Sequence, residues 1–250
     1  MKVREVSIDA PPALVHAPWR AAFPWLIQGC TTRGPEPERP FDLGLFSDAS
    51  PARHVLEHWQ RLRAATGQTR VVHAQQVHGA NVRFHLPGPP GLHICETCDG
   101  HVTAEAGVLV GVSTADCVPI FVVDPKKRAV AALHAGWRGA TSGVLERGLE
   151  VMQESVGSDP ARIHLHLGPA ICGDCYEVGS EVFEALEQPA PANPAPIDLR
   201  AVLAQRAVDA GVAQDQITVS EHCTRCGESG LFSHRGGDRE RQVGYIGIRA

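Results

Sequence analysis

The sequence predicts a globular domain that contains both strands and helices, and three observations support this. A chain of 250 residues with 43% apolar content is long enough to form one large core. Apolar runs rich in β-branched residues, typical of strands, recur between positions 70 and 135. Elsewhere, apolar residues three and four positions apart predict amphipathic helices. We therefore expect residues 1–250 to form a single domain.

Charge and hydropathy exclude several classes of function. The formal net charge is -5, Lys and Arg do not cluster, and aromatic residues make up only 5%, so no nucleic-acid partner is expected. The N-terminal stretch lacks the apolar core of a signal peptide, and the longest apolar runs are too short to span a membrane. We expect a soluble, cytoplasmic protein, and no obligate protein partner is evident.

The first 67 residues are predicted to form mainly scaffold. Residues 1–33 predict a pair of strands, and Arg33 lies just before a Pro-rich loop at 34–40, where residues are either solvated or bind ligands. A helix is predicted over Pro51–Thr66, with Ser50 as its cap and Gly67 as its stop. Its buried stripe is expected to contain Val55, Leu56, Trp59 and Leu62.

Two strand-like runs then flank the sequence Gln76-Val77-His78-Gly79. A glycine directly after a histidine lets the backbone turn close to a ligand. Several other histidines occur nearby and are expected to be ordinary polar residues. His78 is therefore the candidate ligand of this region.

A β-hairpin is predicted within residues 113–139. The runs Val118–Val123 and Ala129–Leu133 are apolar and β-branched, and a turn is predicted over residues 124–127, with proline second. If residues 124 and 127 pair, Cys117 lies directly opposite His134, with Cβ atoms about 4.5–5.5 Å apart. Such a pair can bind one metal ion, or can act as a nucleophile and its base.

The second half of the chain alternates helices and strands. The predicted elements are a helix over Ala140–Val156, a strand over Ile163–Leu167, a short helix over Ser180–Glu187, a helix capped by Asp198 that runs to Ala210, and a strand over Gln216–Ser220. His164 and His166 share one face of their strand and are expected to lie on an exposed edge. The arginine-rich C-terminal loop is either solvated or binds an anion.

Six of the eight cysteines form three C-x-x-C pairs, namely Cys95/Cys98, Cys172/Cys175 and Cys223/Cys226. Two such pairs about 15–20 residues apart would indicate structural zinc, but these pairs lie much farther apart. We expect ordinary reduced thiols, with redox or metal roles as the alternative. The first and third pairs are predicted to be dispensable for the reaction.

Five motifs occur in a characteristic order: QVHG at 76–79, TADC at 114–117, HAGWRG at 134–139, GPAI followed by CYEVG at 168–179, and CT-x-C followed by LFSHR at 223–235. Together they resemble the multicopper polyphenol oxidase (laccase-domain) family, whose members look like zinc-dependent purine nucleoside phosphorylases despite that name. The resemblance runs from about residue 28 to the C-terminus. It implies an α+β fold: one complex domain with a large mixed β-sheet flanked by helices, similar also to the toxin deamidase cytotoxic necrotizing factor.

The resemblance also implies the chemistry. The family's metal ligands fall on His78, Cys117 and His134, with Zn²⁺ preferred to copper, and two imidazoles with one thiolate leave tetrahedral zinc an open position. That position could hold a water, with its pKa brought toward about 7, for attack on a purine C6, or a phosphate for attack at the ribose C1′. The implied reactions are cleavage of adenosine or inosine by phosphate into base and ribose 1-phosphate, and deamination of adenosine.

Further residues are assigned by position and chemistry. Asp116, next to a ligand, is a candidate catalytic or ligand-orienting acid, or a plain structural acid. Arg33, Arg138 and Arg235 are candidates for phosphate or ribose contacts, because guanidinium groups match phosphate geometry. The chain departs from the family pattern at Asp42, His234 and Cys172, where Asn, Tyr and Gly are usual.

Three alternatives remain open. Cys117 and His134 without metal could form a thiol hydrolase or amidase. A copper polyphenol oxidase would need several H-x-H pairs, and this chain has one, at 164–166. A non-catalytic zinc module could be built on the C-x-x-C pairs.

Overall fold

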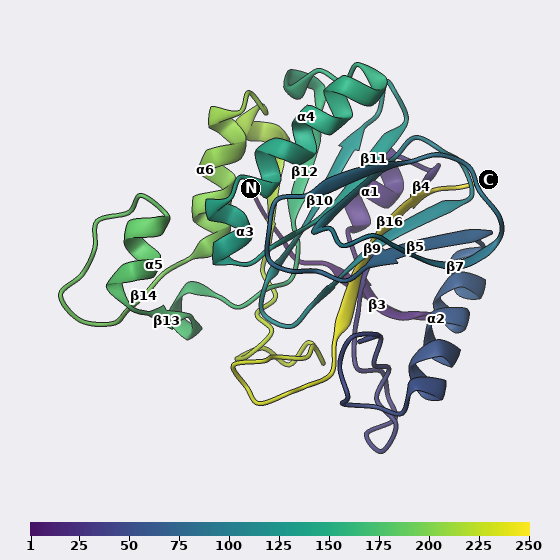
Figure 1. Cartoon of the computed structure of the whole chain (residues 1–250), viewed down its shortest axis with the longest axis horizontal. Coiled ribbons are helices and arrows are strands. Elements are labelled where there is room, and N and C mark those ends of the chain that lie inside the picture. The colour runs from purple at the N-terminus through teal and green to yellow at the C-terminus, as the bar shows by residue number, and fades with distance from the viewer.

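The computed structural model describes all 250 residues, and its strands form two mixed seven-stranded sheets with helices on their outer faces (Figure 1). None of the helices is long and apolar enough to cross a membrane. The predicted class, a mixed α and β fold with sheet flanked by helices, is confirmed. The one large sheet that the resemblance implied is divided into two.

The strand order of each sheet brings together distant parts of the chain. Sheet A has the order β1 (Lys2–Val3), β15 (Ile217–Ser220), β12 (His164–Leu167), β10 (Val118–Asp124), β11 (Ala129–Ala135), β8 (Gly100–Thr103) and β6 (Val82–His85). Sheet B has the order β2 (Val6–Asp9), β3 (Pro12–Val15), β4 (Leu26–Thr31), β16 (Gln242–Ile248), β9 (Val108–Thr114), β5 (Arg70–Ala74) and β7 (Gly91–Cys95). The C-terminal strand β16 thus lies between β4 and β9, at the centre of sheet B.

Six helices and a small ribbon complete the fold. The helices are α1 (Ala17–Ala22), α2 (Ala52–Thr66), α3 (Trp137–Thr141), α4 (Val144–Val156), α5 (Ser180–Ala185) and α6 (Leu199–Asp209), with 3₁₀ turns at Pro160–Arg162, Gly173–Cys175 and Gln214–Gln216. The ribbon pairs β13 (Glu177–Val178) with β14 (Ala195–Pro196). Figure 1 shows α5 and this ribbon at the left edge, away from the two sheets.

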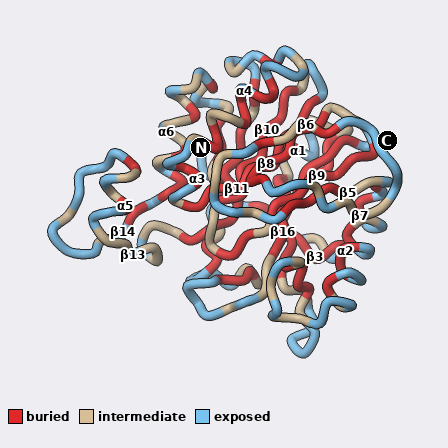
Figure 2. Tube along the Cα trace, viewed as in Figure 1, coloured by how far each residue is buried: buried red, intermediate tan, exposed pale blue.

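The layers follow from strands that are apolar on both faces. In β10, Ile120 and Val122 belong to the core shared with α4 and α6, whereas Phe121 and Val123 belong to the core between the two sheets. Figure 2 shows the resulting buried centre in red. Helix α2 covers the outer face of sheet B, so the layer order is helices, sheet A, sheet B, helix. The interior strands therefore cannot move without disturbing two cores.

The hairpin forms, but its predicted register is wrong. Val118 pairs with Ala135 and Asp124 with Ala129, so the loop has four residues and the register is shifted by two. Arg128 in this loop adopts a φ of 50°, which a turn over residues 124–127 did not require. Because a shift of two preserves the side-chain face, Cys117 and His134 still point to the same side of the sheet. His134 lies opposite Pro119, and Cys117 lies just before β10.

Two helix predictions need correction. Helix α2 starts after Pro51 and receives no side-chain cap, so Ser50 does not cap it, and Leu56 is 46% exposed instead of joining the buried stripe. The helix expected over residues 140–156 is two helices, α3 and α4, because Gly143 between them has a φ of 82°. The first of the two helices, α3, begins at Trp137, which is closer to His134 than the predicted start at residue 140.

The edge-strand prediction for the H-x-H pair is also wrong. Strand β12 lies inside sheet A, between β10 and β15. His166 is fully buried, with its Nε2 2.9 Å from Glu5 Oε1 and its Nδ1 3.0 Å from Thr218 Oγ1. Partners from distant strands satisfy this imidazole, so its polarity did not indicate exposure.

Candidate active site

The three predicted ligands come together from three separate segments. His78 lies in the turn after β5, Cys117 between β9 and β10, and His134 in β11. One ligand atom of each lies within 4.8 Å of the others, and Cys117 Sγ is 3.8 Å from His78 Nε2. His78 is exposed, Cys117 half-buried and His134 buried, so the group is reachable from solvent on one side. The arrangement fits two imidazoles and a thiolate around one metal ion.

The backbone reaches this arrangement through unusual conformations. His78 has a φ of 60° and Asp116 a φ of 88°, each of which costs on the order of 1–3 kcal/mol in a residue other than glycine. The carboxylate of Asp116 holds its turn in place by accepting from the Thr224 hydroxyl and from the Arg235 backbone N–H. Asp116 therefore faces the C-terminal loop and fixes the position of Cys117.

A glycine allows the ligands to approach each other. A Cβ at Gly136 would lie 2.9 Å from His78 Cδ2 and 3.0 Å from Cys117 Sγ. Any other residue would push these side chains apart. The absence of a side chain at Gly136 thus allows His78 and Cys117 to lie close together.

Asp99 is the residue that the sequence did not reveal. This fully buried carboxylate lies 2.9 Å from His134 Nδ1 and accepts backbone N–H groups of Val77, His78 and Gly79 at 3.2, 2.9 and 2.8 Å. It holds His134 with Nδ1 protonated, which leaves Nε2 free for a ligand. The pairing of β8 with β11 places Asp99 beside His134, and no local sequence pattern indicates that pairing.

Cys117 and His134 each shift the pKa of the other toward its charged form. Burial alone would raise the pKa of the Cys117 thiol, but the adjacent His134 and His78 lower this pKa to about 6. Burial alone would lower the pKa of His134, but Cys117 and Asp99 raise this pKa to about 9. Between these values, the metal-free site holds a thiolate beside an imidazolium.

This ion pair predicts how Cys117 reacts in the metal-free protein. Alkylation by iodoacetamide should rise with pH around a midpoint near 6, instead of about 8.5 for an ordinary thiol, because only the thiolate reacts. Peptide mapping of the alkylated protein at pH 5 to 9 measures this midpoint, with buried Cys30 expected to stay unmodified. A midpoint at 8 or above would contradict the ion pair.

The three ligands line a cavity of about 310 Å³, which is in the size range of small-molecule sites. Its other walls combine one aromatic ring, imidazoles, one side-chain amide and one guanidinium. Among the lining residues are Phe46, His73, Gln76, Ser113, His234 and Arg241. Gln76 is held by two hydrogen bonds to the Ser113 backbone, at 2.7 and 2.8 Å. This part of the wall is therefore preformed.

The structure does not bring the three predicted arginines into this cavity. Arg33 is bonded to Asp238 at 3.1 Å, and its guanidinium lies 4.9 Å from the ring centroid of Phe232. Exposed Arg138 lies over Trp137, 4.2 Å from the ring centroid. These two side chains are directed at neighbours on the protein.

Arg235 also points elsewhere, since it donates to the Glu177 carbonyl at 3.0 Å and lies over Tyr176. The arginine that lines the cavity is Arg241, and His234 lines it as well. Both belong to the C-terminal loop, which the sequence predicts to be either solvated or anion-binding. Their positions depend on how this loop folds back over the sheet, which local sequence does not indicate.

Comparison with known proteins identifies similar chains among curated proteins and among solved structures. The chain is 33% identical to "Purine nucleoside phosphorylase YlmD" of Geobacillus stearothermophilus, over 91% of this chain and 92% of that protein. It is 42% identical to "Adenosine deaminase RL5" of an unknown prokaryotic organism, over 56% of this chain and 57% of that protein. The crystal structure of YlmD from Geobacillus stearothermophilus superposes with a TM-score of 0.87 at 28% identity, over 100% of this chain and 98% of that one.

The family model described as "Multi-copper polyphenol oxidoreductase laccase" matches residues 29–249, which include every strand and helix from β5 to β16 and all three converging ligands. The match therefore agrees with the resemblance that the five motifs indicated. The chain belongs to this laccase family of multi-copper polyphenol oxidoreductases.

Proposed function

We propose that this chain, as a single domain over residues 1–250, is a zinc-dependent purine nucleoside phosphorylase. It would convert adenosine or inosine and phosphate into the free base and ribose 1-phosphate, and would deaminate adenosine as a side reaction. The observation that carries this proposal is the convergence of His78, Cys117 and His134 on a cavity of about 310 Å³. The names of the two relatives support both reactions.

The donor set fits zinc. Zn–N bonds of about 2.0–2.1 Å and Zn–S bonds of about 2.3 Å place a nitrogen and a sulfur ligand of tetrahedral zinc about 3.6 Å apart. The observed 3.8 Å between Cys117 Sγ and His78 Nε2 is consistent with this spacing. When bound, zinc would supply an open coordination position and Lewis acidity.

The chain's own side chains would bind and orient the reactants. Phe46, which is 53% exposed at the cavity, offers an aromatic face to a purine ring. Arg241 and His234 offer N–H donors for phosphate oxygens. Asp99 holds the proton on His134 Nδ1 and thereby keeps the imidazole oriented.

Copper oxidase chemistry is less well supported by the histidines. In the chain's one H-x-H pair, both ring nitrogens of His166 are engaged, by Glu5 and by Thr218. His166 is also fully buried inside sheet A. This pair therefore serves the core, and zinc is the metal that we assign to the cavity.

A thiol hydrolase or amidase is the second candidate. The lowered pKa of Cys117 beside His134, whose pKa is raised, is the charge pattern of an activated cysteine nucleophile. Activity that persists in metal-free protein and is lost on alkylation of Cys117 would favour this candidate over the phosphorylase.

A nucleoside panel tests the proposed reactions. Zinc-loaded protein is incubated with adenosine, inosine or guanosine, with and without phosphate, and the base, ribose 1-phosphate and inosine are measured by chromatography. We expect base release to require phosphate, and inosine to form from adenosine without it. Base release that is independent of phosphate would indicate hydrolysis and contradict the phosphorylase assignment.

A further inference from the structure

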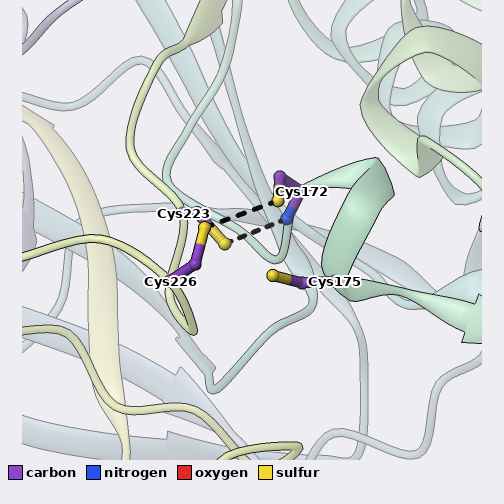
Figure 3. Close-up of side chains that lie close together, drawn as sticks. All are labelled: Cys172, Cys175, Cys223 and Cys226. Atoms are coloured by element: carbon purple, nitrogen blue, oxygen red, sulfur yellow. Dashed lines mark hydrogen bonds between the residues drawn. The ribbon is translucent and has the colours of Figure 1, made fainter.

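Two of the C-x-x-C pairs meet in space although about fifty residues separate them in the chain. Cys172 precedes the 3₁₀ turn before β13 and Cys175 is the last residue of that turn, whereas Cys223 and Cys226 lie in the loop after β15. Their four sulfur atoms all lie within 4.8 Å of one another, and Figure 3 shows the side chains pointing toward a common centre. The cluster belongs to no part of the cavity described above.

We propose that these four cysteines bind a structural zinc ion as a tetrathiolate. Tetrahedral zinc with Zn–S bonds of about 2.3 Å places its sulfur ligands about 3.8 Å apart. The distance between Cys172 Sγ and Cys226 Sγ is 3.8 Å. A closed set of four thiolates leaves no open position, which is typical of a structural and not a catalytic zinc site.

The surroundings of Cys223 favour its thiolate form. The Cys172 and Arg225 backbone N–H groups donate to Cys223 Sγ at 3.2 and 3.4 Å. The guanidinium of Arg225 donates to the Cys175 carbonyl at 3.2 Å, which brings a positive charge next to the cluster. Hydrogen bonds and a cation offset the negative charge that four thiolates would accumulate around Zn²⁺.

The backbone after the last ligand is also tightly placed. A Cβ at Gly227 would lie 2.9 Å from the Cys223 carbonyl oxygen, so a glycine lets the chain fold back over the Cys223–Cys226 turn. Cys223 is in turn bridged to Ala170 in a parallel arrangement. Backbone contacts thus help to hold the two C-x-x-C turns next to each other.

A different histidine and cysteine group lacks these features. His85, Cys95 and His101 also lie close together, but His85 Nε2 is 2.9 Å from His101 Nδ1. This distance is that of a hydrogen bond, so these two ring nitrogens are engaged with each other. The pair Cys95/Cys98 is therefore a matched control for the proposed zinc cluster.

The position of the cluster gives zinc a structural role near the active site. Thr224, between Cys223 and Cys226, donates its hydroxyl to Asp116, and the Ile171 N–H donates to the Asp116 carbonyl at 3.1 Å. A zinc ion on the four cysteines would therefore join the two loops that hold the strained turn before Cys117. The proposal does not depend on which reaction the cavity catalyses.

Metal analysis of the full-length protein, purified under reducing conditions without chelators, tests this proposal. We expect two zinc ions per chain, one after the double substitution Cys175→Ser and Cys226→Ser, one after His78→Ala, and two after Cys95→Ser and Cys98→Ser. The thermal midpoint should fall by roughly 10 °C in the Cys175/Cys226 variant, because a structural metal stabilises the folded state.

Cobalt substitution keeps the test informative if that variant does not fold. Co²⁺ in His78→Ala protein should show the visible and sulfur charge-transfer absorption of a tetrathiolate site, without any change at the four cysteines. Two zinc ions retained in the Cys175/Cys226 variant, a Cys172–Cys226 disulfide in the purified protein, iron in place of zinc, or no tetrathiolate cobalt spectrum would each overturn the proposal.

Discussion

Replacing Cys117 with alanine is expected to abolish both nucleoside phosphorolysis and adenosine deamination, with activity falling by more than about a thousandfold. Such a loss corresponds to about 4 kcal/mol of transition-state stabilisation. The substitution removes the only sulfur among the three ligands that line the cavity, whereas the half-buried side chain fills no core. The variant should therefore fold normally, lose the zinc of the cavity and retain other bound zinc.

The matched control is Cys95→Ser, which changes a half-buried thiol outside the cavity. Its turnover should stay within a few-fold of the unmodified protein. Circular dichroism and thermal unfolding confirm that both variants are folded. Turnover within tenfold of the unmodified protein in folded Cys117→Ala protein would show that this residue does not carry the reaction.

Replacing Asp99 with asparagine is expected to weaken zinc binding at the cavity by about 10–100-fold. Asparagine keeps the shape of the side chain, but its NH₂ group cannot accept the N–H groups that now converge on the carboxylate. His134 then loses the partner on Nδ1 that orients it. Competition with a zinc chelator measures this change in affinity.

A second readout separates positioning from general destabilisation. In metal-free Asp99→Asn protein, the pKa of His134 should fall, because Asp99 raises it. The alkylation midpoint of Cys117 should then rise, because charged His134 lowers the pKa of this thiol. Asp124→Asn is the control, since this buried aspartate also accepts two backbone N–H groups in a turn, far along the hairpin. If both variants lose only thermal stability, Asp99 is structural and does not position His134.

The sequence was informative where local patterns determine structure. Continuous apolar, β-branched runs predicted β10 and β11. Because the side chains of a β-strand alternate between its two faces, Cys117 and His134 stayed on one face although the register was wrong by two. The turn chemistry was incomplete, because a four-residue loop with Arg128 at positive φ replaced the predicted turn. A candidate site could thus be placed before its exact geometry was known.

Local sequence patterns do not predict contacts between side chains on distant strands. Asp99 is recognised only through the β8–β11 pairing, and the ring nitrogens of buried His166 are satisfied because Glu5 and Thr218 lie beside them. Sequence spacing favours ordinary thiols for the two C-x-x-C pairs and leaves a metal role as the alternative, yet adjacent loops bring their four sulfur atoms together. In each case the deciding contact joins segments whose proximity is a property of the whole topology.

The most direct test of the central claim is to titrate zinc into metal-free protein while following ribose 1-phosphate formation from inosine and phosphate. We predict no product without zinc, product formation that saturates when the site of His78, Cys117 and His134 is filled, and none at any zinc concentration in His78→Ala protein. Full turnover in the metal-free protein, or no ribose 1-phosphate from any purine nucleoside at saturating zinc, would contradict the account.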